Sequence, residues 1–249
     1  MKRSVTTTGI VFFSLLFLIL SSGCAMKQDI FLNSDGSGKV DFEIKLAPYF
    51  AEVMDQLSEL VPSEENQPKP EEGTFFNIPK LREDFSKRKG VSLTRLEAPS
   101  PLKLAGSFSF TDINTAVTDG GKTNNPGIFT FTRGSGGVSV LRVDINYSTL
   151  EALLAENPSM NNPLMENFGP LANRDITETD YLDMMEYMLG EESRKGITDS
   201  DLDLTIKVKG KIVGQAGGKI TGSDSVHFKI PLLKILVLKE PLTYSVRFK

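Results

Sequence analysis

The chain has 249 residues, a formal net charge of −4, one cysteine, one histidine and no tryptophan. Its acidic balance gives no electrostatic reason to bind nucleic acid or anionic headgroups. A single cysteine cannot form an internal disulfide, so a fold of this length must rest on an apolar core.

The first 23 residues have the pattern of a secretory signal peptide. A basic start precedes an almost wholly apolar run at residues 10–20 and three small residues at 21–23. Since a membrane-spanning helix needs about 20 apolar residues, this run is too short for a stable anchor. The pattern predicts a signal peptide at 1–23 and a single mature domain at 24–249. Removing Lys2 and Arg3 leaves 26 basic against 32 acidic side chains, a mature charge of about −6.

The residues before the only cysteine resemble the lipobox of bacterial lipoproteins. The matching residues are Leu20, Ser21, Ser22, Gly23 and Cys24, with the leucine one place earlier than in the strict motif. The resemblance implies a thioether-linked diacylglycerol on Cys24, cleavage before it, and acylation of the new amino group. Two or three acyl chains hold a protein lastingly at a membrane, so we expect anchoring on the exported side of the inner membrane. A secreted protein with a free thiol is the alternative.

Alternating apolar residues predict strands, and helical spacing predicts helices, through the first part of the mature chain. Residues 28–46 alternate on both sides of the polar turn Asn33–Gly38, which is typical of a β-hairpin. We expect Asn77 to cap a helix that carries Pro79 in its first turn and ends at Gly90. The expected elements are a hairpin at 28–46, a helix at 48–60, a mobile acidic and proline-rich loop at 62–73, a helix between 77 and 90, and strands at 91–97 and 102–110.

The second half mixes the same two patterns. Ser148 and Glu151 form a capping-box pattern, and Thr177 is the expected cap of a later helix that ends at Leu189. The expected elements are a hairpin at 127–147, a helix from 148 to about 156, an irregular loop at 157–175, a helix at 177–189, and strands at 202–208 and 242–248. Because no regular βαβ rhythm is present, we predict an α+β fold with a largely antiparallel sheet and several helices packed on it.

The chain resembles the LppM-type envelope lipoproteins of mycobacteria in its opening hairpin and in three C-terminal stretches, at 208–214, 226–232 and 241–246. The resemblance lies in the order of the elements and the placement of their turns. It implies a mixed α/β envelope domain. Lipid or glycolipid binding has been proposed for this family. It assigns no site residue.

Two loops imitate ligand-binding motifs but lack a required part. Residues 116–123 fit a loose phosphate-loop pattern, yet the following Asn-Asn-Pro-Gly prevents the helix that such a loop needs. The turn Asn33–Gly38 resembles the start of a calcium loop, but its twelfth position holds Ile44 instead of glutamate. With His227 as the only histidine, catalytic triads, Cys–His pairs and histidine-built metal sites are excluded. We expect no metal and no cofactor.

The helix predicted at 177–189 carries the candidate site of the mature domain. Its apolar side carries Tyr181, Met184, Met185 and Met188, and its polar side carries Asp180, Asp183 and Glu186. Methionines adapt to varied apolar surfaces, which makes the apolar side a candidate face for a ligand or a partner protein. Packing in an ordinary helix core is the commoner role of such a stripe.

Taken together, the patterns favour a non-catalytic envelope lipoprotein that binds a lipid-like ligand or another envelope protein. It contacts the membrane through its lipidated N-terminus, and no nucleic-acid partner is expected. The alternative is a carboxylate-dependent hydrolase acting on cell-wall glycan, which needs two convergent carboxylates beside a cleft. A passive structural role would leave no pattern in the sequence.

Overall fold

Seven strands form the larger of two β-sheets in the computed structural model, which describes residues 25–48, 74–116, 127–156 and 163–249. In sheet order they are β3 (Val91–Ser100), β4 (Lys103–Phe110), β2 (Gly38–Lys45), β1 (Ala25–Leu32), β7 (Asp201–Val208), β10 (Ser225–Pro231) and β9 (Lys219–Ile220). Neighbouring strands are antiparallel except β1 and β7, which are parallel. The parallel pair joins the N-terminal hairpin to the C-terminal third of the chain.

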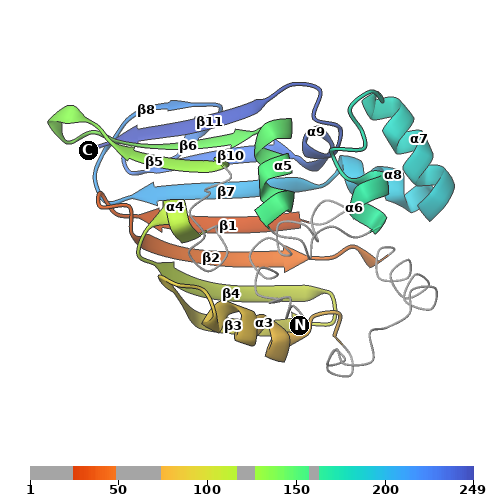
Figure 1. The fold of residues 1–249 in the computed structure, drawn as a ribbon, viewed down its shortest axis with the longest axis horizontal. Coiled ribbons are helices and arrows are strands. Elements are labelled where there is room, and N and C mark those ends of the chain that lie inside the picture. Colours follow the sequence, from red (N-terminus) through yellow and green to blue (C-terminus); the bar gives the residue numbers. More distant parts are fainter. Residues whose placement is uncertain (1–24, 49–73, 117–126, 157–162) are drawn as a thin grey trace, which may run out of the picture.

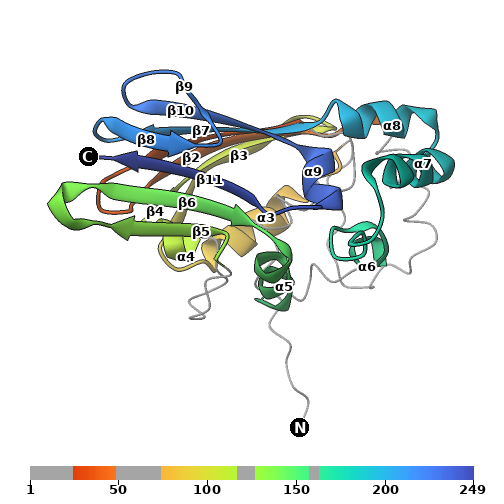
Figure 2. The same ribbon diagram turned by 90° about the horizontal axis from the view of Figure 1, so that it is seen from above.

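A smaller antiparallel sheet covers one face of the larger one (Figures 1 and 2). Its strands are, in order, β5 (Phe129–Arg133), β6 (Ser139–Ile145), β11 (Leu242–Phe248) and β8 (Ile212–Ala216). The rings of Phe228 on β10 and Tyr244 on β11 meet edge to face, with centroids 5.6 Å apart. The covered face of the larger sheet, called the inner face below, is therefore one wall of the core.

Helices lie at the ends of the sheets and on the same inner side. They are α3 (Ile78–Ser86), α4 (Ile113–Ala116), α5 (Tyr147–Glu156), α6 (Pro163–Phe168), α7 (Glu178–Leu189), α8 (Glu191–Thr198) and α9 (Leu232–Val237). Helices α7, α8 and α9 contact one another at one end of the larger sheet (Figure 1). None of the helices between residues 25 and 249 that the structure describes is long and apolar enough to span a bilayer.

Period-two alternation decides which side chains enter the core. Along β7, Leu202, Leu204 and Ile206 are buried on the inner face, while Lys207 is exposed on the outer face. Three phenylalanine rings from different elements continue this wall. Phe108 of β4 lies 6.2 Å from Phe42 of β2 and 5.5 Å from Phe85 of α3, measured between ring centroids. Burial of such large rings is the main source of stability in a core without disulfides.

The structure confirms the predicted α+β class, and most of the predicted elements that it describes. The hairpin at 28–46 corresponds to β1 and β2, and the two caps expected at Asn77 and Thr177 are both present. Asn77 Oδ1 accepts from the Lys80 backbone N–H at 3.0 Å, and Thr177 forms a capping box with Asp180. Short-range hydrogen-bonding patterns therefore predicted these helix starts correctly.

Three predictions in the second half of the chain were wrong in detail. Helix α5 is capped by Asn146 and Thr149, whose side chains bond each other's backbone N–H groups at 3.0 Å, and not by Ser148 and Glu151. The expected irregular loop at 157–175 contains α6, and α8 and α9 were not predicted at all. The Asn146 side chain already accepts from a backbone N–H group of the first turn. Glu151 forms an ion pair with Arg174 instead.

Several predictions fall on residues outside the described part of the chain. They are the signal peptide at 1–23, the lipid-attachment residue Cys24, the helix at 48–60 beyond Pro48, the loop at 62–73, and the phosphate-loop imitation beyond Ala116.

Candidate ligand-binding hollow

A small apolar hollow, with enclosed room for about one water molecule, lies between the inner face of the larger sheet and β5. Its walls come from four strands and one short helix. They are Gln28 and Ile30 of β1, Val40 of β2, Phe108 and Phe110 of β4, Ile113 and Ala116 of α4, and Phe129 of β5. All but one of these side chains are apolar.

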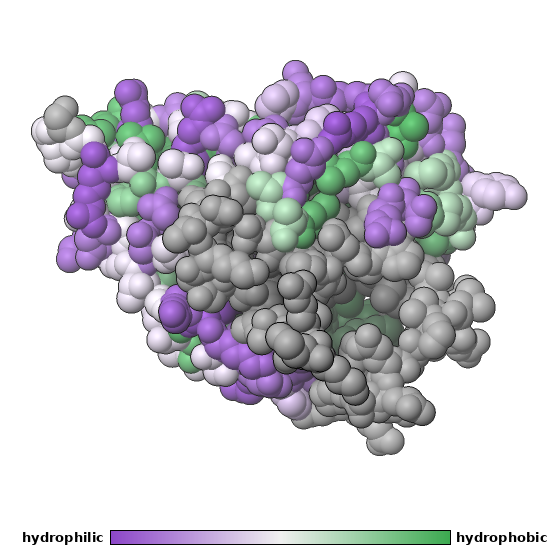
Figure 3. All heavy atoms as spheres, viewed as in Figure 1, coloured by the Kyte–Doolittle hydropathy of each residue, from purple (hydrophilic) through white to green (hydrophobic). Residues whose placement is uncertain are grey.

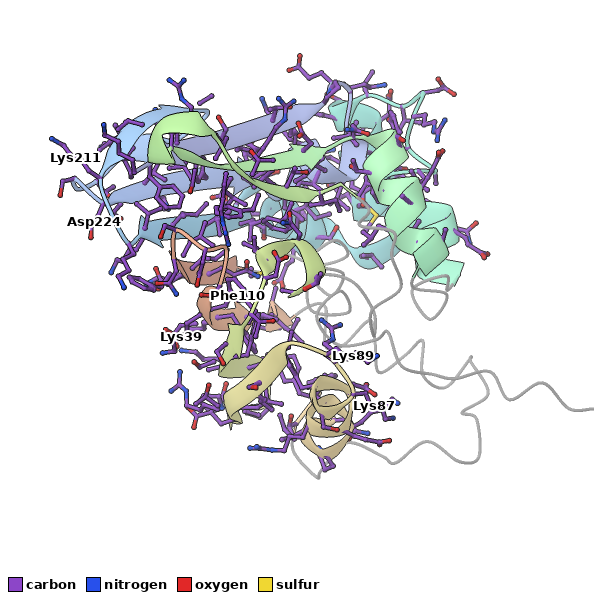
Figure 4. All side chains as sticks on the ribbon, turned by 60° about the vertical axis from the view of Figure 1, so that its left-hand side comes forward. Lys39, Lys87, Lys89, Phe110, Lys211 and Asp224 are labelled. Carbon is purple, nitrogen blue, oxygen red and sulfur yellow. The ribbon has the colours of Figure 1, made fainter. Side chains whose placement is uncertain are left out.

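Strand register brings the floor of the hollow together. Val40 lies directly opposite Ile30 on one side and Phe108 on the other, so three consecutive strands place one apolar row on the inner face. Phe110, at the end of β4, continues the wall where the chain turns into α4 (Figure 4). The floor therefore depends on pairing between residues that lie far apart in the sequence.

Helix α4 and strand β5 are held over this floor by one asparagine. Asn114 Nδ2 donates to the Phe131 carbonyl at 3.2 Å, and the Phe131 N–H donates to Asn114 Oδ1 at 2.8 Å. The side-chain amide thus bonds the strand much as a neighbouring strand would. Asp112 caps the start of the helix, because its Oδ1 accepts from the Asn114 N–H at 2.9 Å. The Ile113 N–H donates to the Gly36 carbonyl at 2.9 Å and so ties the roof of the hollow to the turn of the hairpin beneath it.

Gln28 is the polar exception in the lining. Its side chain is 7% exposed, on the inner face of β1 between Met26 and Ile30. Within the described part of the chain, the one hydrogen bond of its amide runs from Nε2 to Met26 Sδ at 3.6 Å, and a thioether is a weak acceptor. The amide therefore has donor and acceptor capacity left for a ligand or a water molecule in the hollow. The sequence signal is a polar residue at a period-two core position, and Gln28 was not among the predicted site residues.

The predicted site on α7 divides into a core part and a surface part. Tyr181 is fully buried and Met185 is 3% exposed, so both belong to the core, as the commoner interpretation of the stripe expected. Met184 is half-buried, while Met188 is 46% exposed. Tyr187, which was not singled out, is 92% exposed beside them. Two of the four predicted residues are therefore buried in the core and two are at least partly exposed, and none of them lines the hollow.

The acids of α7 have structural roles. Asp180 accepts from the Thr177 hydroxyl and backbone N–H, and these hydrogen bonds lower the pKa of its carboxyl. Asp183 and Glu186 both bind Arg194 of α8, and the bond to Glu186 raises the pKa of that guanidinium. Arg194 therefore ties the two helices together.

Other carboxylates are dispersed, and the pKa values of two of them are shifted in opposite directions. Asp29 and Asp41 face each other across β1 and β2 on the outer face, each beside a lysine. Burial acts to raise the pKa of Asp41, but hydrogen bonds from Lys39 and Ser107 outweigh it, so the pKa is lowered. Asp84 of α3 is fully buried, its carboxyl oxygens have no hydrogen-bond partner among the described residues, and burial raises its pKa. Asp84, the carboxyl with the raised pKa, is therefore not a member of the Asp29–Asp41 pair.

Two further polar groups singled out in the sequence are structural. His227 Nε2 lies 3.1 Å from Asp203 Oδ1, across the β10–β7 pair on the outer face. In the turn after β1, the Asp35 carboxylate accepts from both the N–H and the hydroxyl of Ser37, and the hydroxyl bond lowers the pKa of Asp35. Among the residues that the structure describes, no cluster of three or more His, Cys, Asp or Glu side chains could hold a metal ion.

Comparisons with known proteins show little beyond these observations. No protein-family model matches the chain, and no curated protein matches it either. One similar solved structure is the NMR structure of the folded domain of LppM from Mycobacterium tuberculosis, with 12% identity, 92% of this chain and 91% of that chain covered, and a TM-score of 0.39. Native yeast LTA4 hydrolase shares 7% identity over all of this chain and 31% of that one, with a TM-score of 0.32.

Proposed function

We propose that this chain is a non-catalytic, lipid-anchored envelope lipoprotein whose hollow binds the acyl chain of a lipid-like ligand. The observation that carries the ligand part is the apolar hollow with one buried amide, Gln28, in its wall. The signal-like start and the residues around Cys24 carry the anchor part.

The end of an acyl chain suits the hollow in chemistry. Apolar walls stabilise methylene groups by about 0.8 kcal/mol for each one removed from water. The hollow is small, which favours the end of a slender acyl chain over a bulky glycan. The Gln28 amide can donate to a carbonyl or accept from a hydroxyl of such a ligand. A partner protein, the other ligand class considered, would need an exposed surface instead.

The hydrolase alternative has weaker support. A glycosidase uses a protonated acid and a second carboxylate about 5–10 Å apart beside the scissile bond. Asp29 and Asp41 are close, but they lie on an open sheet face and Asp41 has a lowered pKa. Asp84 has the raised pKa, but its nearest charged partners are Lys80 and Lys87, each at 3.9 Å.

A hollow-filling variant tests the ligand part. Val40→Phe places a larger ring among the lining residues, and Lys39→Phe places the same ring on the outer face of the same strand (Figure 4). We expect Val40→Phe to weaken binding of a fluorescent fatty acid to the delipidated mature protein at least about tenfold, a loss of 1.4 kcal/mol. Lys39→Phe should bind like the unchanged protein.

Gln28→Leu provides a milder second variant, because it preserves side-chain volume and removes the amide. Fatty-acid binding should weaken while the thermal midpoint stays about the same, since the one hydrogen bond that the amide loses is a weak bond to sulfur. Equal affinity in the unchanged protein and in both hollow variants, each shown to be folded, would contradict the proposal.

A further inference from the structure

The end of the larger sheet where β1 begins carries the helices α7, α8 and α9. Strand β1 starts at Ala25 and pairs in parallel with β7, which starts at Asp201 just after α8 ends at Thr198. Strand β10 ends at Pro231, opposite Asp201, and leads directly into α9. Figure 1 shows all three helices at this end. The register therefore fixes them near the first residue of β1.

Cys24 is bonded directly to Ala25, so no linker separates the proposed lipid attachment from the sheet. Consecutive Cα atoms are about 3.8 Å apart, which leaves the anchor within one residue of the first strand. A domain attached so closely must present this end of the sheet to the bilayer. The opposite end, where β10 begins and β9 pairs with it, must point away.

An exposed apolar strip lies on α7 at the anchor end. Met184, Tyr187 and Met188 are spaced three and four residues apart, so they are neighbours on one side of the helix. Tyr187 is 92% and Met188 46% exposed, while Met184 is half-buried and packs against the core. Figure 3 shows pale green, moderately hydrophobic atoms gathered over α7 at this tip. We call these three residues the α7 strip.

Resting on the proposed lipid attachment at Cys24, we propose that the α7 strip lies in the headgroup region of the phospholipid bilayer that holds the anchor. Tyrosine favours this region, because its ring is apolar and its hydroxyl stays hydrated. Methionine adapts its flexible side chain to irregular lipid packing. The strip and the anchor together orient the domain, with the far end of the sheet directed away from the membrane.

Charge does not provide the attraction. Asp180, Asp183 and Glu186 lie on the same helix as the strip, and Arg194 of α8 is already bound to two of these acids. A contact made by apolar burial should therefore form on uncharged zwitterionic lipid and withstand raised salt, because screening weakens only charge-based binding.

The chain contains no tryptophan, so a single introduced tryptophan reports its own surroundings without background. Tyr187→Trp places the probe in the α7 strip. Ile220→Trp is the matched control, because Ile220 is 52% exposed and pairs with Val226 at the opposite end of the sheet. The full mature protein, purified from bacterial membranes, is placed in phosphatidylcholine vesicles with or without brominated acyl chains.

We expect the Tyr187→Trp emission to shift to shorter wavelength in vesicles and to lose intensity with brominated lipid, both unchanged by salt. The Ile220→Trp emission should stay at the wavelength of the water-exposed fluorophore and keep its intensity.

Equal quenching of the two probes, or no quenching of either, in a chain whose mass shows lipidated Cys24 would overturn this inference alone. A chain without lipid on Cys24 would contradict the proposed function, and with it the premise of this inference. Quenching that appears only with anionic vesicles and vanishes with salt would also contradict it.

Discussion

The two faces of the β1–β2 hairpin differ in what they carry. The inner face buries an apolar row that supports both the core and the hollow, whereas the outer face carries lysines and aspartates in exposed pairs. Figure 2 shows no described helix or strand over the outer face. Each face has one exception: Gln28 is polar on the inside and Phe31 is an exposed ring on the outside. Stability and ligand binding should therefore reside on the inner face, and the exceptions are the informative residues.

The largest effect is expected from removing a ring on the inner face. Phe42→Ala deletes a side chain that is 3% exposed and packs against Phe108, so unfolding free energy should fall by about 3–5 kcal/mol. Phe31→Ala on the outer face of the same hairpin should cost less than about 1 kcal/mol. Urea unfolding of both variants measures the contrast, and equal losses would show that the two faces are not distinct.

A smaller loss is expected from crowding the same wall. In Gly106→Ala, the added Cβ would lie 2.3 Å from Phe42 Cζ and 3.0 Å from the Arg95 carbonyl oxygen, so the ring must shift. Overpacking of this kind costs about 1–3 kcal/mol. Ser109→Ala, at an exposed position of the same strand, is the control. An unchanged urea midpoint for Gly106→Ala would mean that the inner wall is looser than its contacts indicate.

The buried acid Asp84 should make stability depend on pH. Burial raises its pKa in the folded state above the unfolded value, so the folded state holds its proton more tightly. The contribution of this group is therefore favourable below the unfolded pKa and is lost as pH rises through the folded pKa. Asp84→Asn should raise stability at pH 7 by about 1 kcal/mol and have little effect at pH 3. Thermal midpoints of both proteins across this range test the sign, and a lower midpoint for the variant at pH 7 would reverse it.

The smallest effect is expected for ion pairs of the outer face. Lys27 lies 3.6 Å from Asp29, and the two side chains are 65% and 41% exposed. Lys27→Met should change unfolding free energy by no more than about 0.5 kcal/mol, because exposed pairs gain little beyond their hydration and side-chain entropy. A loss comparable to that of Phe42→Ala would show that the outer face contributes to stability like the inner one.

Local patterns in the sequence predicted local structure well and the site poorly. Asn77 and Thr177 were identified as caps because a cap is a hydrogen bond between residues a few positions apart. Helix α9 was missed because its sequence, Leu-Leu-Lys-Ile-Leu-Val, is a short apolar run without a clear helical period. The hollow joins residues of β1, β4 and β5 that only non-local strand pairing brings together. A stripe on one helix, such as that of α7, is visible in the sequence, whereas its division into core and surface is decided by packing.

Lipid attachment at Cys24 underlies both the proposed function and the orientation of the domain, and the mass of the mature N-terminal peptide tests it most directly. The protein is purified from bacterial membranes in detergent, digested, and its first peptide is analysed by mass spectrometry. We expect that peptide to begin at Cys24 and to carry a diacylglycerol and an amide-linked acyl chain. A peptide that begins elsewhere, or one that begins at Cys24 with an unmodified thiol, would contradict the account.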